Sequence, residues 1–123
     1  MIKEGKWSWW HENGKKKEES NWNNGISEGR SIHYFDNGQK SSEGTYKDGK
    51  QEGKWTWWYK NGQKKEESNW NNGISEGRSI HYFDNGNKSE ERIYKDGALD
   101  GLGTWWYENG QKETEAAYKD GKE

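Results

Sequence analysis

Short segments in which aromatic and polar residues alternate make up most of this chain. The segment Lys6-Trp7-Ser8-Trp9 is typical, and each such segment leads to an Asn-Gly or Asp-Gly pair. Alternation with a period of two indicates a half-buried β-strand. Asn-Gly and Asp-Gly favour tight hairpin turns, because both residues tolerate a positive φ. The pattern therefore predicts an all-β protein of short antiparallel strands.

The turn signals recur with a period of 24 residues. Each period opens with a glycine, and the units begin at Gly5, Gly29, Gly53, Gly77 and Gly101. Every unit contains two Asn-Gly or Asp-Gly pairs, which is enough for two strands per unit. Residues 1–123 are therefore interpreted as one repeat array, in which five double-hairpin units form a single antiparallel β-meander of about ten short strands.

Alternate units are more alike than neighbouring ones. The segment 16–38 is identical, residue for residue, to the segment 64–86. Such identity indicates a very recent duplication or deliberate construction. A residue that is present in all five units is most simply explained by folding, so a function is expected in a repeated surface or in a departure from the repeat.

The register follows if every turn is treated as a two-residue type I′ loop. Glu18 then lies opposite Trp9 and opposite Ser31 of the next unit, which predicts a stagger of two residues per unit. Side-chain alternation sorts the aromatic residues onto two faces. The predicted core face carries Trp7, Trp9, His11, Trp22, His33, Phe35, Tyr46, Trp55, Trp57, Tyr59, Trp70, His81, Phe83, Tyr94, Trp105, Tyr107 and Tyr118. The opposite face carries one aromatic row among charged residues, namely Trp10, Tyr34, Trp58, Tyr82 and Trp106.

Composition adds that this sheet is unusually polar. Hydrophobic residues make up 25% of the chain, and the mean hydropathy is −1.71. These values alone would indicate disorder. Disordered chains have few aromatic residues, however, whereas this chain has 15%, including ten tryptophans. We therefore expect a folded, thin structure.

Charge and segment composition exclude several classes of partner. The net charge is −2 and the basic residues form no stripe, which argues against nucleic-acid binding. There is no cysteine, and no apolar run is long enough for a signal peptide or a membrane span. From these features we expect a cytoplasmic protein that is not inserted in a membrane and needs no cofactor.

Three segments resemble a known repeat family. They are WWYKNGQKKEESNWNNG, HYFDNGQKSSEGTYKDGKQEG and WWYENGQKETEAAYKDG, and they are similar to bacterial variants of MORN repeats over residues 5–121. The chain departs from the pattern in its Trp-for-Tyr exchanges, in the segment 21–24 and in the segment 98–103. The resemblance implies a β-hairpin meander with a protein-binding or scaffold role. It also implies, more specifically, an antitoxin or immunity protein.

Neither a metal site nor a catalytic site is expected. His33 and His81 lie 48 residues apart, and His11 would lie two strands from His33, which is too far for a shared zinc ion. Five copies of one Glu-Lys pattern, which begins with Glu19 and Lys16, are better explained by cross-strand charge pairs than by acid-base catalysis. The interpretation is a protein that is not an enzyme.

The aromatic row is the feature with a plausible ligand. Its members are expected about 10 Å apart or a little more, since each unit adds two strands to the sheet. Flat side chains at that spacing can hold an extended protein segment or stack along a glycan. The remaining alternative is a purely structural or engineered array, in which these rings only cover a thin sheet and the chain assembles with itself.

Self-association is also expected from the sequence. No segment resembles a polar cap, and both terminal strands would expose hydrogen-bonding groups beside large aromatic side chains. Face-to-face packing of two sheets, end-to-end pairing and hairpin exchange all remain open. The contact residues expected for at least a dimer are Trp7, Trp9, Trp55, Trp57 and Trp105.

Overall fold

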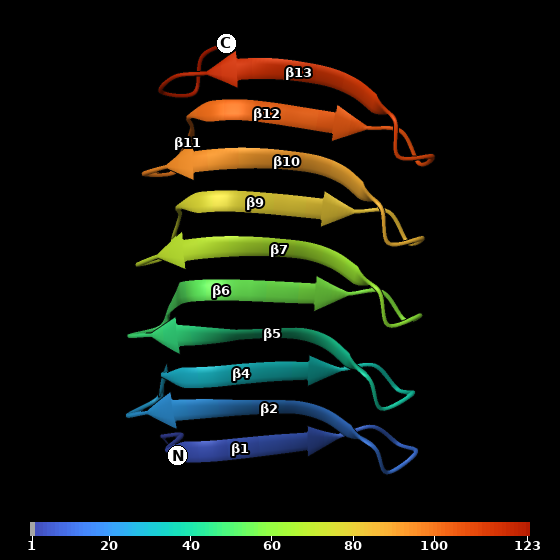
Figure 1. Cartoon of the computed structure of the whole chain (residues 1–123). Coiled ribbons are helices and arrows are strands. Elements are labelled where there is room, and N and C mark those ends of the chain that lie inside the picture. Colours follow the sequence, from blue (N-terminus) through green and yellow to red (C-terminus); the bar gives the residue numbers. More distant parts are fainter. Residues whose placement is uncertain (1) are drawn as a thin grey trace.

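The computed structural model describes residues 2–123, which form one open antiparallel β-sheet (Figure 1). Thirteen strands and no helix are present in this part of the chain. The strands are β1 (Gly5–Trp10), β2 (Lys16–Asn23), β3 (Ile26–Ser27), β4 (Gly29–Tyr34), β5 (Lys40–Lys47), β6 (Lys50–Trp58), β7 (Lys64–Asn71), β8 (Ile74–Ser75), β9 (Gly77–Tyr82), β10 (Lys88–Lys95), β11 (Ala98–Leu99), β12 (Gly101–Trp106) and β13 (Lys112–Tyr118).

Ten of these strands follow one another across the sheet in the order of the sequence. The path is β1-β2-β4-β5-β6-β7-β9-β10-β12-β13, so the two ends of the chain lie at opposite edges of the sheet (Figure 1). The two-residue strands β3, β8 and β11 each pair with the strand before them and complete a hairpin. The all-β meander that the turn spacing predicts is confirmed.

The two turns of a unit are of different kinds, which corrects the expectation of type I′ loops throughout. In the second turn, Asn24 and Gly25 have φ of 54° and 82°, as a type I′ turn requires. In the first turn only Gly14 has a positive φ, of 87°. There the Gly14 N–H donates to the His11 carbonyl, and the His11 N–H donates to the Lys15 carbonyl. This is a three-residue loop with a glycine bulge.

Bulges also change the register between units, and the predicted stagger is wrong. Glu18 faces Trp9 as expected, but on its other side it faces His33 instead of Ser31. Between the pairs Trp22–Ser27 and Glu19–Ile32, the chain advances three residues along β2 and five along the opposite strand. The two extra residues cancel the stagger, so equivalent residues of successive units lie directly in line.

The predicted division into two faces is correct, but the expectation that one face is the core is not. We call the face with Trp7 and Trp9 the aromatic face, and the face with the aromatic row the charged face. The buried hydrophobic residues are Trp55 on the aromatic face and Ile32 on the charged face. The buried polar residues are serines and threonines. The described strands form one layer, and no second layer of this part of the chain packs on either face. Most large side chains therefore remain partly exposed to water.

Trp55 is the most deeply buried aromatic side chain, with 4% of its surface exposed. Its ring packs edge-on against Tyr46 at 5.0 Å and stacks on Trp57 at 5.8 Å. Gly44 on the neighbouring strand leaves room for it, because a Cβ atom at Gly44 would lie 2.0 Å from Trp55 Cδ2. The indole N–H donates to the Thr45 carbonyl at 3.1 Å.

Candidate binding site

The aromatic row lies on the charged face as one straight line of rings. Its members sit at the ends of β1, β4, β6, β9 and β12, and each faces a lysine on the next strand. The pairs are Trp10–Lys16, Tyr34–Lys40, Trp58–Lys64, Tyr82–Lys88 and Trp106–Lys112. Sequence reasoning named the rings but missed these lysines, because only the bulge at each first turn brings them opposite the rings.

The surface around the row is hollowed at its centre. Trp58 lines hollows of about 370, 350 and 450 Å³. The largest is shared with Tyr82 and Lys64, and another with Lys40. Trp10, at the start of the row, is 60% exposed. Tyr34, Trp58, Tyr82 and Trp106 are half-buried, so each of these four rings offers only part of its surface to a ligand that lies across the strands.

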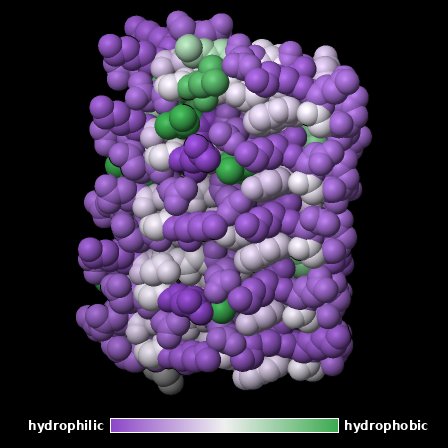
Figure 2. Space-filling view, viewed as in Figure 1, coloured by the Kyte–Doolittle hydropathy of each residue, from purple (hydrophilic) through white to green (hydrophobic). Residues whose placement is uncertain are grey.

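A row of glutamates runs beside the aromatic row, and each is held by basic side chains. Lys6 and Lys16 both contact Glu19, and Arg30 and Lys40 both contact Glu43. The third and fourth units repeat this arrangement around Glu67 and Glu91, whereas in the fifth unit Glu115 contacts only Lys112 among the described residues. Two basic groups for each carboxylate in the first four units give these strands a positive excess on a chain whose net charge is negative. Figure 2 views one face of the sheet and shows mainly hydrophilic residues, with hydrophobic ones confined to small spots.

Glu67 has the most strongly perturbed carboxylate of the row. Burial opposes its charge, but hydrogen bonds from Lys54, Tyr82 and Lys64 outweigh burial and lower its pKa to about 2. Tyr82 donates its hydroxyl to Glu67 at 2.7 Å, and burial together with this bond raises the pKa of Tyr82 to about 12. This contact fixes one ring of the aromatic row against the glutamate row.

The pKa of Glu67 predicts an acid-sensitive contribution to stability. Because the folded-state pKa is depressed from 4.5 to about 2, the contribution is present above pH 4.5 and is lost as the pH falls toward 2. Glu67→Gln is expected to remove about 1–2 kcal/mol of this pH dependence, less than the shift alone implies because the site is partly solvated. Urea denaturation at several pH values between 7 and about 2 measures it.

A matched pair of variants separates this contact from general acid effects. Tyr82→Phe removes the donated hydroxyl but keeps the ring, so it should give an acid dependence between those of the parent and of Glu67→Gln. Glu12→Gln, in an exposed turn, serves as the control for charge removal. An unchanged slope in Glu67→Gln would contradict the assignment.

The tryptophans expected to mediate self-association are on the aromatic face, but their settings differ. Trp55 is enclosed by its own chain, whereas Trp7, Trp9, Trp57 and Trp105 remain partly exposed. At the first unit, the Lys3 ammonium lies 5.3, 5.0 and 4.5 Å from the ring centres of Trp7, Trp9 and Trp22. This cation–π contact was not predicted, since nothing in the sequence pattern places Lys3 over the rings.

The histidines occupy separate places on the sheet. His33 and His81 lie beside Glu18 and Glu66 at 3.7 and 3.6 Å, and His11 donates to the Tyr34 carbonyl at 3.1 Å. Within residues 2–123 no three His, Asp or Glu side chains converge as metal ligands would. Nor does that range contain a helix of the length and apolarity needed to cross a membrane.

Comparison with known proteins agrees with the repeat geometry. The family model of the MORN repeat variant matches residues 3–24, 27–48, 51–72, 75–96 and 99–120. No curated protein matches the chain. MORN repeats are generally non-enzymatic binding or scaffold modules. With five tandem matches that cover most of its length, the chain belongs to the MORN repeat variant family.

Proposed function

We propose that this protein is a non-enzymatic binding module whose aromatic row holds an extended, acidic protein segment. The observation that carries the proposal is the straight line of five rings, each of which faces a lysine on the adjacent strand. Such a row presents flat apolar surfaces and positive charge at a fixed interval, which suits a partner of regular spacing.

The interval matches an extended polypeptide. Successive rings lie two strand spacings apart, with one strand between them, which gives a distance of about 9.5 Å. An extended chain covers this distance in about three residues, since each residue spans about 3.3 Å. In the polyproline II conformation, which has three residues per turn, every third side chain points to the same side, so a segment with an apolar side chain at every third position can place one side chain on each ring.

The surrounding charge favours an acidic partner. In the first four units two basic side chains flank each glutamate of the charged face, so carboxylates between the apolar anchors of a partner would approach a positive surface. A neutral glycan would stack on the rings but would gain nothing from the lysines. For this reason we favour a protein partner over a glycan.

An antitoxin or immunity role is a special case of this proposal. In that case the segment held by the row would belong to a toxin, and binding would block the toxin's activity. The family supports a binding or scaffold role in general, and the specific role is our inference from the resemblance of the sequence. Co-expression with the product of a neighbouring gene would test it directly.

Binding of a designed peptide tests the surface itself. The probe is a 15-residue peptide, which is about the length needed to span five rings, with Leu at every third position and Asp or Glu between. We expect binding to the parent protein that weakens as salt is raised, since exposed charges are screened. Trp58→Ala together with Tyr82→Ala should weaken binding by about tenfold or more, because these two rings lie at the centre of the row. Fluorescence titration or calorimetry measures both effects.

The controls distinguish the row from the rest of the sheet. His33→Ala changes an exposed side chain on the aromatic face and should leave the affinity unchanged. A peptide of the same composition in scrambled order should bind more weakly. If the double variant binds as well as the parent, or if neutral oligosaccharides bind the row and the peptide does not, the proposal is wrong.

A further inference from the structure

We propose that a second copy of this chain adds its β1 to β13 of the first, so that the sheet continues from one molecule into the next. β1 and β13 each pair with a single long neighbour among the described strands, whereas the eight strands between them pair on both sides. The contact is distinct from the aromatic row and does not rest on the function proposed above. The pairing of β5 with β6 inside the chain serves as the template for the proposed contact.

The sequences on both sides of the proposed contact repeat those of that internal junction. Residues 118–122 read Tyr-Lys-Asp-Gly-Lys, as do residues 46–50, which end β5 and begin β6. Residues 5–10 of β1 match residues 53–58 of β6 at every position except Ser8, which stands for Thr56. β1 is thus nearly a copy of the tryptophan-rich strand β6. β13 shares with β5 the residues Lys112, Glu115 and Tyr118 and the turn that follows the strand.

The register of the internal junction defines the contact. Ser42 faces Trp57 and Glu43 faces Thr56. β13 follows β5 by 72 residues, so Thr114 is the equivalent of Ser42. Trp9 of the second copy is the equivalent of Trp57. Thr114 would therefore face Trp9 of the second copy. Glu115 would then face Ser8 of that copy.

Packing on the aromatic face is complementary in the same way. Inside the chain, Tyr46 meets Trp55 edge-on at 5.0 Å. Tyr118 and Trp7 of the second copy stand at the equivalent positions. Trp7 is partly exposed in the single chain, whereas its equivalent Trp55 is 4% exposed, because β1 lacks the neighbour that β5 provides to β6. The added strand would therefore cover part of the Trp7 ring, but less closely than β5 covers Trp55, because Ala116 stands in the place of Gly44.

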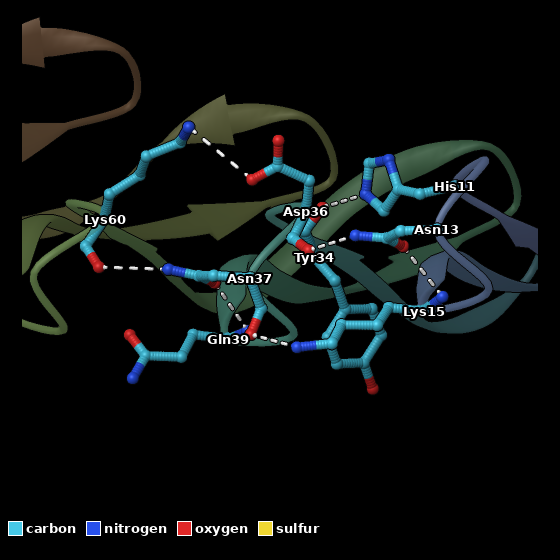
Figure 3. Close-up of polar contacts among 8 residues, drawn as sticks. All are labelled: His11, Asn13, Lys15, Tyr34, Asp36, Asn37, Gln39 and Lys60. Carbon is cyan, nitrogen blue, oxygen red and sulfur yellow. Dashed lines mark hydrogen bonds and ion pairs between the residues drawn. The ribbon is translucent and has the colours of Figure 1, made fainter.

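The loops at the first turns supply matching polar groups. Successive units are joined there by asparagine side chains, since Asn13, Asn37, Asn61 and Asn85 donate to the carbonyls of Asp36, Lys60, Asp84 and Glu108 at 2.7, 3.4, 2.8 and 3.0 Å. Figure 3 shows the first two of these bonds. Asn109 is the next donor in this series, and the carbonyl that corresponds to its acceptor is that of Glu12 in the second copy.

A tyrosine follows the same rule. The Tyr59 hydroxyl donates to the Tyr82 carbonyl of the next unit at 2.7 Å. Tyr107 is the equivalent of Tyr59 in the fifth unit, and it is 52% exposed. In the proposed contact its hydroxyl would reach the Trp10 carbonyl of the second copy.

Two features keep this association reversible. Residues 2 and 3 of the second copy correspond in the repeat to residues 122 and 123 of the first, so one of the two short segments must move aside. Ala116 also stands where β5 has Gly44, and a Cβ at Gly44 would lie 2.0 Å from Trp55 Cδ2. Because each added copy presents a new free β13, the contact is head-to-tail and produces open chains of molecules of increasing length.

Variants at Ala116 test the contact in both directions. Ala116→Gly restores the glycine of β5 and should raise the association constant by about tenfold, since it relieves the clash with Trp7 of the second copy. Ala116→Arg should lower it by about tenfold or more, because the side chain occupies the place of that ring. Arg92 holds the equivalent position in β10, where it faces Ser79 of β9, so the fold accommodates arginine there.

Sedimentation velocity over about a hundredfold dilution measures the association of the full chain. The parent should show a mass that rises with concentration above 14.5 kDa. Ser41→Arg is the matched control, because it adds the same charge far from both edges, at a position that Lys17 and Lys65 occupy in other units. It should associate like the parent, and circular dichroism checks that each variant is folded. A constant mass of 14.5 kDa for the parent and for Ala116→Gly, or equal association of Ala116→Arg and the parent, would overturn the proposal.

Discussion

Trp55→Ala is expected to lower the free energy of unfolding by about 3 kcal/mol, more than any other single aromatic truncation in this chain. Trp55 is 4% exposed, packs against Tyr46 and Trp57, and donates its indole N–H to the Thr45 carbonyl. Truncation removes this burial and leaves the carbonyl without that donor. The value lies at the low end for a buried tryptophan because a single-layer sheet lets water into the space that is left.

Trp10→Ala is the matched control for that experiment. Trp10 is 60% exposed, so its truncation should cost less than about 1 kcal/mol. Urea denaturation followed by circular dichroism measures both variants on the same scale. Equal losses in the two variants would show that Trp55 contributes no more than an exposed ring, which would contradict the packing described above.

Gly44→Ala is expected to lower the free energy of unfolding by about 1–3 kcal/mol, through overpacking against Trp55. The added Cβ would lie 2.0, 2.2 and 2.5 Å from three atoms of the Trp55 ring, so the ring has to move away from Tyr46. Gly44 is not among the residues with a positive φ, so the cost comes from this contact and not from the backbone. The measurement is again the urea midpoint.

A double-mutant cycle isolates the contact between the two residues. In a Trp55→Ala background the ring is gone, so adding Gly44→Ala should cost little or should even stabilise, because alanine favours strands more than glycine does. The coupling energy should therefore be about as large as the cost of Gly44→Ala alone. Additive losses would mean that the backbone, and not the ring, requires glycine at this position.

The alternation of aromatic and polar residues and the spacing of the turns were sufficient to predict the elements of this fold. Asn-Gly and Asp-Gly pairs separate segments of strand length, and the absence of proline leaves each segment free to pair on both edges. Because side chains alternate strictly along a strand, Trp9 and Trp10 had to lie on opposite faces. The two faces were therefore assigned correctly before the register was known.

The same local rules could not separate the two kinds of turn. Asn13-Gly14 and Asn24-Gly25 are the same dipeptide, but Asn24 has a φ of 54° and Asn13 is not among the residues with a positive φ. The difference arises from contacts that are distant in sequence. Asn13 donates to the Asp36 carbonyl of the next unit, whereas the Asn24 N–H donates to the Glu4 carboxylate at 2.7 Å.

Only the tertiary structure shows how successive units are aligned and which residues this alignment brings opposite one another. The extra residues at Gly29 bring His33, rather than Ser31, opposite Glu18, and so remove the predicted stagger. The bulge at each first turn brings a lysine opposite every ring of the aromatic row, as Lys64 lies opposite Trp58. Sequence fixes which residues alternate because alternation is local. The sequence pattern does not show where a bulge inserts a residue. Several pairings of neighbouring strands satisfy the same alternation, and the pairing energies that distinguish them depend on contacts between strands.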